Sequence, residues 1–278
     1  MLLFLDRLER AWNASRSLVS IGLDPVPDRM PVADVYEFNA AIIDATVDVV
    51  CAYKPNLAFY EALGMPGLRA LEKTLEHIRG RSGDVLVIGD GKRGDIGNSS
   101  VGYARGLFEM WGFDAVTVNA YGGRDSIEPF LAYGDRGVFV WCRSSNPGAE
   151  DFQDLEVAGD CGTERLYQRM ARRLREWNVN ENVGLVVGAT YPEELESLRR
   201  EYPEMPFLIP GVGAQQGELG TAVRAGVDSE GRGAIINSSR GVLYASSGAD
   251  FAEAAREQAV RLRDGINQAL EREGKGWS

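Results

Sequence analysis

The chain has 278 residues, of which 44% are hydrophobic, and carries a net charge of −11 at neutral pH. This content can bury a large core, and the length suits either one barrel-sized domain or two smaller ones. The negative charge argues against non-specific nucleic-acid binding and against an anionic membrane surface, because both favour basic patches.

The cysteines and the N-terminal residues indicate where such a chain works. Cys51, Cys142 and Cys161 are odd in number and far apart, which fits reduced thiols better than disulfides or a zinc site. The opening apolar run is too short for a signal peptide, and no stretch is long enough to span a membrane. We therefore expect a cytoplasmic protein with no metal site and no membrane partner.

Short apolar runs alternate with longer amphipathic segments along the chain. Eight of these runs predict strands, at 18–24, 49–56, 85–90, 115–120, 137–142, 183–188, 207–213 and 233–239. The clearest helical patterns are 35–50, 164–177, 192–202 and 250–273. Strands that are apolar on both faces indicate a parallel sheet. Repeated strand–helix units predict a single (β/α)8 TIM barrel over residues 1–278. An open doubly wound sheet is the second choice, because no GxGxxG follows the first strand.

The only histidine, His77, lies in the helical pattern "LEKTLEHIRG" with charged residues on its outer face. We expect it to be a surface helix residue. A Ser-His-Asp or Cys-His catalytic device and a polyhistidine metal site are therefore not expected.

The fifth predicted strand is followed by a long loop insertion at 143–162. Loops of more than about 15 residues in compact domains are usually lids or binding segments, or else disordered. We expect this one to be a lid.

Polar residues stand where the predicted strands end, which is where active sites of such barrels lie. They are Asp24, Lys54, Asn56, Asp90, Lys92, Asn119, Arg143, Ser144 and Ser145. The chain has only four lysines, so two of them at strand ends favour a function. Unlike arginine, lysine can deliver a proton and have its pKa tuned. Asp90 and Lys92 point to the same side if the strand stays extended, and with Asp24 and Lys54 they would form an acid–base array without metal.

The loops after the last two strands favour phosphate binding. In "IPGVGAQQGE" (209–218), Gly211 and Gly213 let the backbone approach a ligand, and the following helix offers free N–H groups. "INSSRG" adds hydroxyls, including that of Ser239, and Arg240, which can bind phosphate through two parallel hydrogen bonds. These loops form the frequent phosphate site of the fold.

The same residues resemble the orotidine 5′-phosphate decarboxylase family. "DGKRGDIG" matches its D-x-K-x-x-D-I signature, and "GLDP", "YKPN", "SSNP", "PGVGAQ" and "SSRG" occur in the family's order across 20–242. "KRGDIG", "SNP" and the insertion are similar to the longer subgroup. The resemblance implies a cofactor-free, homodimeric barrel enzyme that decarboxylates orotidine 5′-monophosphate to uridine 5′-monophosphate in pyrimidine biosynthesis.

The resemblance implies roles for the charged residues at the strand ends. Asp24 and Lys54 would hold the ribose hydroxyls and the charged array. Asp90 would face the substrate carboxylate, and Lys92 would protonate the ring carbon as carbon dioxide leaves. Arg93 receives no catalytic role, and we expect it to pack or pair nearby.

The resemblance also implies that the site is shared between subunits. Asp95 would reach across the dimer interface into the partner's site, with Ile96 and Ser99 beside it. The signature would then serve two active sites.

The remaining substrate contacts are expected at Asn119, Ser144, Ser145, Gly213, Gln215, Ser239 and Arg240. By resemblance, either Ser144 or Ser145 would contact the pyrimidine, and Ser145 is favoured. Gln215 and Arg240 would hold the phosphate.

Three other functions are weaker alternatives. A sugar-phosphate lyase or aldolase on the same barrel would share DxKxxD but usually need magnesium, which Lys54 would repel. A non-catalytic phosphate-binding protein would not need the complete charged set. A Schiff-base aldolase would use Lys54 or Lys92 as a nucleophile, but neighbouring carboxylates keep a lysine protonated.

Overall fold

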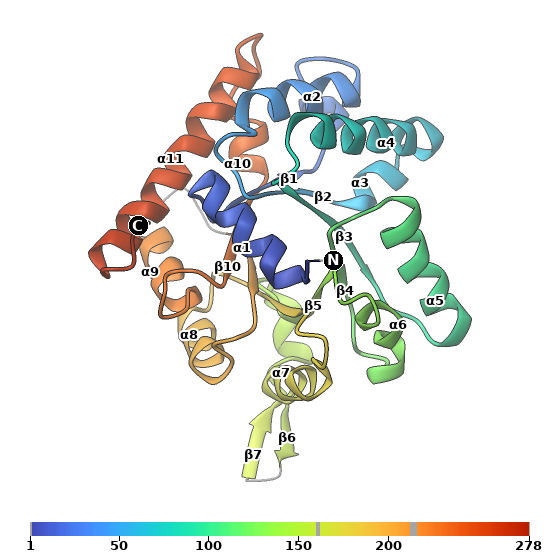
Figure 1. The fold of residues 1–278 in the computed structure, drawn as a ribbon, viewed down its shortest axis with the longest axis vertical. Coiled ribbons are helices and arrows are strands. Elements are labelled where there is room, and N and C mark those ends of the chain that lie inside the picture. The colour runs from blue at the N-terminus through green and yellow to red at the C-terminus, as the bar shows by residue number, and fades with distance from the viewer. Residues whose placement is uncertain (1, 160–161, 212–215, 278) are drawn as a thin grey trace.

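The structure, a computed structural model, describes residues 2–277 apart from 160–161 and 212–215. Eight parallel strands form a closed barrel, as the sequence predicts, and β10 completes the ring against β1 (Figure 1). The strands are β1 (Val19–Leu23), β2 (Ala52–Pro55), β3 (Leu86–Arg93), β4 (Ala115–Val118), β5 (Gly137–Arg143), β8 (Val183–Val187), β9 (Phe207–Pro210) and β10 (Ala234–Ser238). Each predicted strand overlaps an observed one, and their ends differ by at most three residues.

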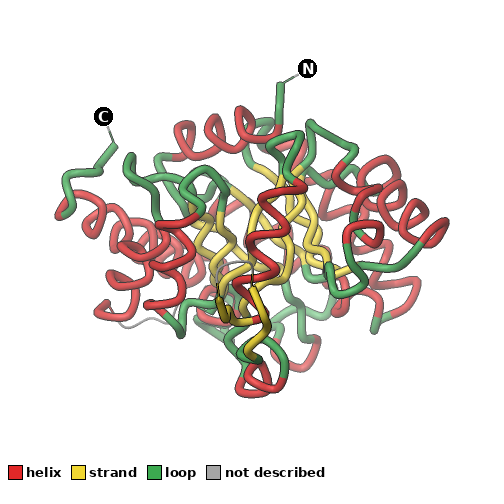
Figure 2. The backbone as a smooth tube through the Cα atoms, turned by 90° about the horizontal axis from the view of Figure 1, so that it is seen from below, coloured by secondary structure: helices red, strands yellow, loops and turns green. Residues whose placement is uncertain are grey.

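Helices surround the barrel (Figure 2). The α-helices are α1 (Phe4–Ser15), α2 (Val35–Thr46), α3 (Leu57–Glu61), α4 (Gly64–Arg81), α5 (Gly97–Arg105), α6 (Glu128–Leu131), α7 (Leu166–Trp177), α8 (Pro192–Glu201), α9 (Gln216–Gly226), α10 (Arg240–Leu243) and α11 (Phe251–Arg272). Shorter turns are η1 (Pro27–Arg29), η2 (Gly106–Met110), η3 (Arg124–Ser126) and η4 (Pro147–Asp151). The four clearest predicted helices correspond to α2, α7, α8 and α11. Within the described residues, none of these helices is long and apolar enough to cross a membrane.

Helix α1, which the sequence analysis did not predict, lies across the N-terminal ends of the strands, in front of the barrel in Figure 1. The ring of Phe4 packs edge-on against Phe139, with 6.0 Å between centroids. A Cβ at Gly137 would lie 2.3 Å from the Phe4 ring, so the glycine makes room for it. Arg7 pairs with Asp114 beside this contact. The helix therefore closes the end of the barrel opposite the catalytic end.

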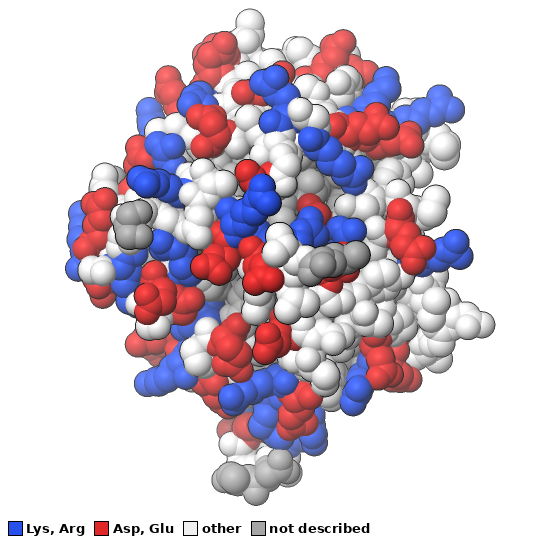
Figure 3. Space-filling view, in the orientation of Figure 1, with Lys and Arg blue, Asp and Glu red and all other residues white. Residues whose placement is uncertain are grey.

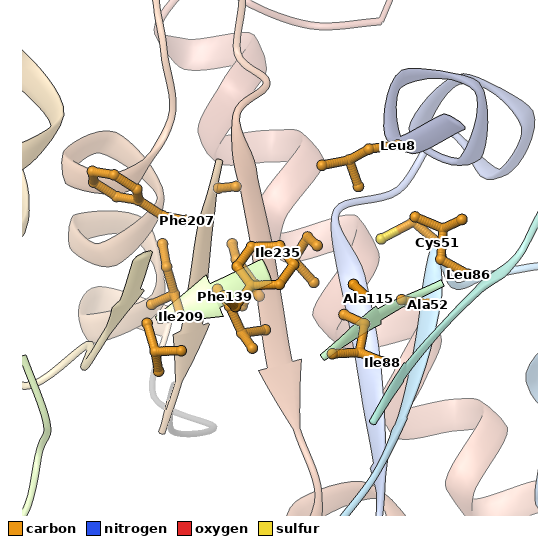
Figure 4. Close-up of a cluster of buried hydrophobic side chains, with 14 of the residues drawn as sticks. Leu8, Cys51, Ala52, Leu86, Ile88, Ala115, Phe139, Phe207, Ile209 and Ile235 are labelled. Atoms are coloured by element: carbon orange, nitrogen blue, oxygen red, sulfur yellow. The ribbon is translucent and has the colours of Figure 1, made fainter. Parts of the chain in front are cut away.

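Apolar side chains fill the barrel interior. Figure 4 shows part of this buried cluster, in which Ile88, Phe139 and Ile235 come from different strands and have no exposed surface. Gly184 lies beside Phe139, and a Cβ there would come within 2.5 Å of its ring. Because this interior is occupied by hydrocarbon, the polar strand residues are left at the C-terminal mouth.

The insertion after β5 has more structure than the predicted loop. It contains η4 and a two-stranded antiparallel hairpin of β6 (Glu156–Gly159) and β7 (Gly162–Arg165). The hairpin projects away from the barrel beyond α7 (Figure 1). Both strands have only four residues and contain no fully buried side chain, so no long apolar or alternating run marks them in the sequence. The predicted insertion after the fifth strand is present and contains these short elements, whereas a lid movement stays a prediction.

Candidate active site

Three charged side chains meet at the mouth of the barrel. Lys54 from β2 donates to Asp90 Oδ2 at 2.6 Å, and Lys92 donates to Asp90 Oδ1 at 2.7 Å. Lys54 and Asp90 are almost entirely buried, whereas the Lys92 side chain is 36% exposed. One carboxylate thus holds two ammonium groups, of which that of Lys92 is the more accessible.

The backbone around Lys92 departs from an extended strand. Lys92 has φ +44°, which is uncommon for a residue with a side chain. The pairing of β3 with β4 shifts between Gly89↔Val116 and Arg93↔Val118, so the strand bulges there. The reason given for Asp90 and Lys92 sharing a side, continued extended geometry, is therefore wrong. The bulge brings the ammonium back to Asp90, and such backbone conformations cost about 1–3 kcal/mol and occur at functional sites.

Thr117, in the middle of β4, is part of the site and was missed by the sequence analysis. Its hydroxyl donates to Asp90 Oδ1 at 2.7 Å and accepts from the Lys92 N–H at 3.0 Å. It is 1% exposed. One hydroxyl therefore fixes both the carboxylate and the bulged backbone. The available signal was a single hydroxyl residue inside the otherwise apolar run "AVTV".

The two carboxyl groups at the mouth respond differently to burial. Burial alone would raise the pKa of Asp90, but Lys54 and Lys92 outweigh it and hold the pKa well below its usual range. Burial raises the pKa of Asp24, and Lys54 and the Ser239 hydroxyl oppose that rise only in part. Asp24 Oδ1 is buried and has no hydrogen-bond partner among the described residues. Such an acceptor suits a ligand hydroxyl.

The charged residues open into a cavity of about 1070 Å³. Its lining includes Asp24, Arg29, Lys54, Asn56, Asp90, Gly211, Asn237, Ser238, Ser239 and Arg240. Asp24, Lys54 and Asp90 therefore share one cavity with residues of the predicted phosphate loops, and Lys92 reaches this group through its bond to Asp90. A phosphorylated ligand could occupy both ends at once.

The structure describes only part of the predicted phosphate-binding end of the cavity. Gly211 has φ +83°, a conformation that favours glycine, immediately after β9. Gly213 and Gln215 lie outside the described residues. Ser239 and Arg240 follow β10, and Arg240 has no carboxylate partner within the described part of the chain. An arginine of this kind is available to an anionic ligand.

The two neighbouring serines have different surroundings. The Ser144 N–H donates to Gln153 Oε1 at 2.8 Å, and the Ser144 hydroxyl accepts from Gln153 Nε2 at 2.9 Å. Ser145 Oγ is buried and has no hydrogen-bond partner among the described residues. Ser145 is therefore the serine with a free hydroxyl.

Asn119 lies beside the main cavity. It lines a second, mainly apolar cavity of about 440 Å³ together with Trp141 and Ser144. Its Oδ1 accepts from the Tyr121 N–H at 2.9 Å. The Trp141 ring centroid is 6.0 Å from Lys92 Nζ, so this second cavity lies close to the charged group. The structure thus places Asn119 next to the charged group and outside its main cavity.

The second half of the signature faces outward. Asp95, Ile96 and Ser99 are exposed, and Asp95 Oδ1 accepts from the Ile96 N–H at 2.7 Å. These side chains do not line this chain's own main cavity. Arg93 pairs with Glu61, which confirms the expected nearby pairing.

The remaining titratable candidates lie away from this site. His77 lies on α4, with Nε2 2.8 Å from Asp44 Oδ1. Cys51 and Cys142 are buried, and burial raises the pKa of Cys142 to about 12. Across the described residues, no group of three or more His, Cys, Asp or Glu side chains could hold a metal ion. A metal-free reaction stays a prediction.

Comparisons with known proteins point to one family. Residues 17–257 match a family model described as the orotidine 5′-phosphate decarboxylase / HUMPS family. A relative of that enzyme name from Dehalococcoides mccartyi is 50% identical over 270 residues, covering 97% of this chain and 99% of the relative. Another, from Azoarcus sp., is 48% identical over 95% of this chain and 98% of its own length. The solved OMP decarboxylase of Leishmania donovani has a TM-score of 0.82 and 38% identity, covering 96% of this chain and 98% of that one.

Proposed function

The chain belongs to the orotidine 5′-phosphate decarboxylase / HUMPS family, and we propose how its site converts orotidine 5′-monophosphate into uridine 5′-monophosphate and carbon dioxide. This reaction is the final step of UMP biosynthesis. Lys92 is the proton donor, and Asp90, which also binds Lys54, holds its ammonium in place. The observation that carries the proposal is the hydrogen-bonded Lys54–Asp90–Lys92 chain, in which Lys54 and Asp90 are buried and Lys92 is partly exposed.

The chemistry requires a cation beside the reacting carbon. When the bond to the carboxylate breaks, its electron pair stays on a ring carbon that has little resonance delocalisation. The Lys92 ammonium stabilises this charge and then transfers a proton to the same carbon, which leaves the lysine neutral. Asp90 Oδ1, 2.7 Å from Lys92 Nζ, holds the ammonium in position until that transfer.

No single contact supplies the whole rate enhancement. Two unit charges 4 Å apart interact by about 4 kcal/mol at an effective dielectric of 20. Repulsion between Asp90 and the substrate carboxylate is therefore small beside the roughly 8–23 kcal/mol that enzymes remove from such barriers. Binding of the phosphate, remote from the reacting bond, provides further energy that the site can convert into rate.

The other predicted residues bind the rest of the substrate. Asp24, with a buried unpartnered oxygen, accepts from ribose hydroxyls, and Ser145 contacts the pyrimidine. Arg240 holds the phosphate. The further contacts in this proposal are Asn119, Gly213, Gln215 and Ser239. No cofactor takes part.

We propose that the active form is a cytoplasmic homodimer of single barrel domains spanning 1–278. Asp95 and its neighbours Ile96 and Ser99 are exposed and would complete the partner's site. Figure 3 shows a largely uncharged area around α5 and α6. Val101 on α5 and Met110 at the end of η2 are exposed apolar residues in this region, which suits a buried interface.

The test is the ultraviolet absorbance change when orotidine 5′-monophosphate is added to chelator-treated protein. We expect turnover without metal, and its loss by about a thousandfold or more in Lys92→Ala. Lys73→Ala is the matched control, because Lys73 lies on α4 over the Tyr36 ring. Strict magnesium dependence, or normal turnover by Lys92→Ala, would contradict the proposal.

A further inference from the structure

The insertion after β5 is tied to the active site through buried polar contacts. We propose that Gln153 and Arg143 are positioning residues that hold Ser145 at the pyrimidine end of the substrate. This inference rests on the proposed contact between Ser145 and the pyrimidine. It gives the insertion the role of a fixed brace.

Gln153 binds the residue next to Ser145 at two points. Its Oε1 accepts from the Ser144 N–H at 2.8 Å, and its Nε2 donates to the Ser144 hydroxyl at 2.9 Å. Gln153 is itself held by its backbone, because its N–H donates to the Ala149 carbonyl at 2.8 Å. Both polar groups of Ser144 are thus used, which fixes the backbone that enters Ser145.

Arg143 anchors the preceding residue. It is 1% exposed, its guanidinium binds Asp154 at 3.1 Å and Gln153 Oε1 at 3.4 Å, and it stacks 4.0 Å above the Tyr191 ring. A buried arginine keeps these partners, because a buried charge without a partner is strongly destabilising. The Arg143 carbonyl accepts from the Gly188 N–H at 2.8 Å, which joins this segment to the end of β8.

Gly188 gives Ser145 its space. A Cβ at Gly188 would lie 2.0 Å from Ser145 Oγ, so only glycine permits the hydroxyl to occupy this position. A Cβ at Gly211, after β9, would lie 3.7 Å from the same oxygen. Ser145 Oγ is therefore placed between the ends of β8 and β9, beside the main cavity that Gly211 lines.

The hairpin is joined to the contacts of Arg143 through Asp154. Asp154 uses Oδ2 for Arg143 and Oδ1 for Arg165, at 3.1 Å each, and Arg165 is the last residue of β7. One carboxylate thus connects the end of the hairpin to the end of β5. This connection ties the base of the hairpin to the barrel, while the hairpin itself projects away from it.

The experiment compares two ligands that differ in the base. Titration calorimetry measures binding of uridine 5′-monophosphate and of ribose 5-phosphate, which has no pyrimidine. We expect Gln153→Ala to weaken nucleotide binding about tenfold, since a hydrogen bond is worth roughly 1 kcal/mol or more, and to leave ribose 5-phosphate binding unchanged. Gln153→Glu should restore nucleotide binding, because a carboxylate can accept from both Ser144 and Arg143.

Two further variants approach Ser145 independently of the insertion. Ser145→Ala and Gly188→Ala should both show the same selective loss, and Gln153→Ala should add nothing to Ser145→Ala. Gln168→Ala is the matched control, because Gln168 accepts from the Arg165 N–H on the exposed side of α7.

The outcomes separate the brace from the proposed function. If Ser145→Ala weakens nucleotide binding and Gln153→Ala does not, or if Gln153→Ala weakens both ligands equally, the brace is overturned. If Ser145→Ala has no effect, the proposed pyrimidine contact is wrong. If the parent protein does not bind the nucleotide, the proposed function itself is wrong.

Discussion

At the scale of single residues, Thr117 links the two groups on which catalysis depends. Its hydroxyl donates to Asp90 and accepts from the Lys92 N–H. Valine has nearly the same shape but offers neither bond. Because hydrogen bonds to charged groups contribute about 1.5–3 kcal/mol, we expect Thr117→Val to lower kcat by about tenfold to a hundredfold.

The measurement is steady-state decarboxylation at saturating substrate. Thr74→Val is the matched control, since Thr74 is also a buried threonine, but on α4, where it bonds to the Ala70 carbonyl. Equal losses in both variants would show that Thr117 acts on stability alone.

Asp24 and Asp90 should have opposite effects on stability. The pKa of Asp90 is lowered in the fold, so its contribution is fully present above the unfolded-state pKa of about 3.9 and is lost as the pH falls. The pKa of Asp24 is raised, so the folded state holds its proton more tightly and loses stability as the pH rises through that window. At neutral pH the charge on Asp24 therefore lowers the free energy of unfolding, and the charge on Asp90 raises it.

We therefore expect Asp24→Asn to raise the free energy of unfolding at neutral pH. Asp90→Asn should lower it by about 3–5 kcal/mol, because Lys54 would remain buried without its counter-charge. Urea unfolding at neutral pH and at about pH 4 measures both changes, and the effect of Asp24→Asn should shrink at the lower pH. A loss of stability in Asp24→Asn at neutral pH would contradict this account.

At the scale of elements, α1 is a cover for the end of the barrel that carries no chemistry. Phe4 is fully buried against Phe139 and fills the space left by Gly137. Truncating a buried phenylalanine typically costs about 3–5 kcal/mol. We expect Phe4→Ala to lower the unfolding free energy by this amount and to leave kcat/KM of the folded protein unchanged.

Denaturant unfolding and initial rates on the same samples check this prediction. Leu2→Ala is a suitable control, since Leu2 lies just before α1 and is 51% exposed. A change in kcat/KM comparable to that of an active-site variant would show that α1 also shapes the catalytic end.

The barrel strands could be predicted because each is buried on both faces, which leaves an apolar run with little ambiguity. For the site, the sequence predicted only which residue types stand at the ends of the strands. The bulge at Lys92 depends on pairing with β4 and on the Thr117 hydroxyl. Because these contacts come from another strand, no pattern in the neighbouring sequence predicts the bulge. The hairpin was missed because its two strands have only four residues each. Helix α1 carried a usable signal that was not used, since its buried residues Phe4, Leu8, Ala11 and Trp12 follow helical spacing.

At the scale of the whole molecule, the short segment 90–95 presents its charged side chains to two different places. Lys92 meets Asp90 at the cavity mouth, whereas Asp95, three residues later, is exposed beyond the bulge. A chain that used the signature entirely within its own site would bring Asp95 to the same cavity. The exposed position of Asp95 fits a site completed by a second subunit, which also agrees with the uncharged area around α5 (Figure 3).

Subunit complementation tests this sharing directly. Lys92→Ala and Asp95→Ala should each be inactive as homodimers. When the two variants are co-expressed, each mixed dimer gains one site that combines an intact Lys92 with the partner's intact Asp95. Random pairing should then restore activity to about one quarter of the sites, since half the dimers are mixed and each has one complete site.

The pair Lys92→Ala and Asp90→Asn is the control, because both residues serve the same site and neither arrangement can be complete. Recovery in the first mixture and none in the second is the expected result. No recovery in either mixture, with mixed dimers isolated through a different affinity tag on each variant, would mean that Asp95 acts within its own chain. Full activity of the Asp95→Ala homodimer would mean that Asp95 has no catalytic role.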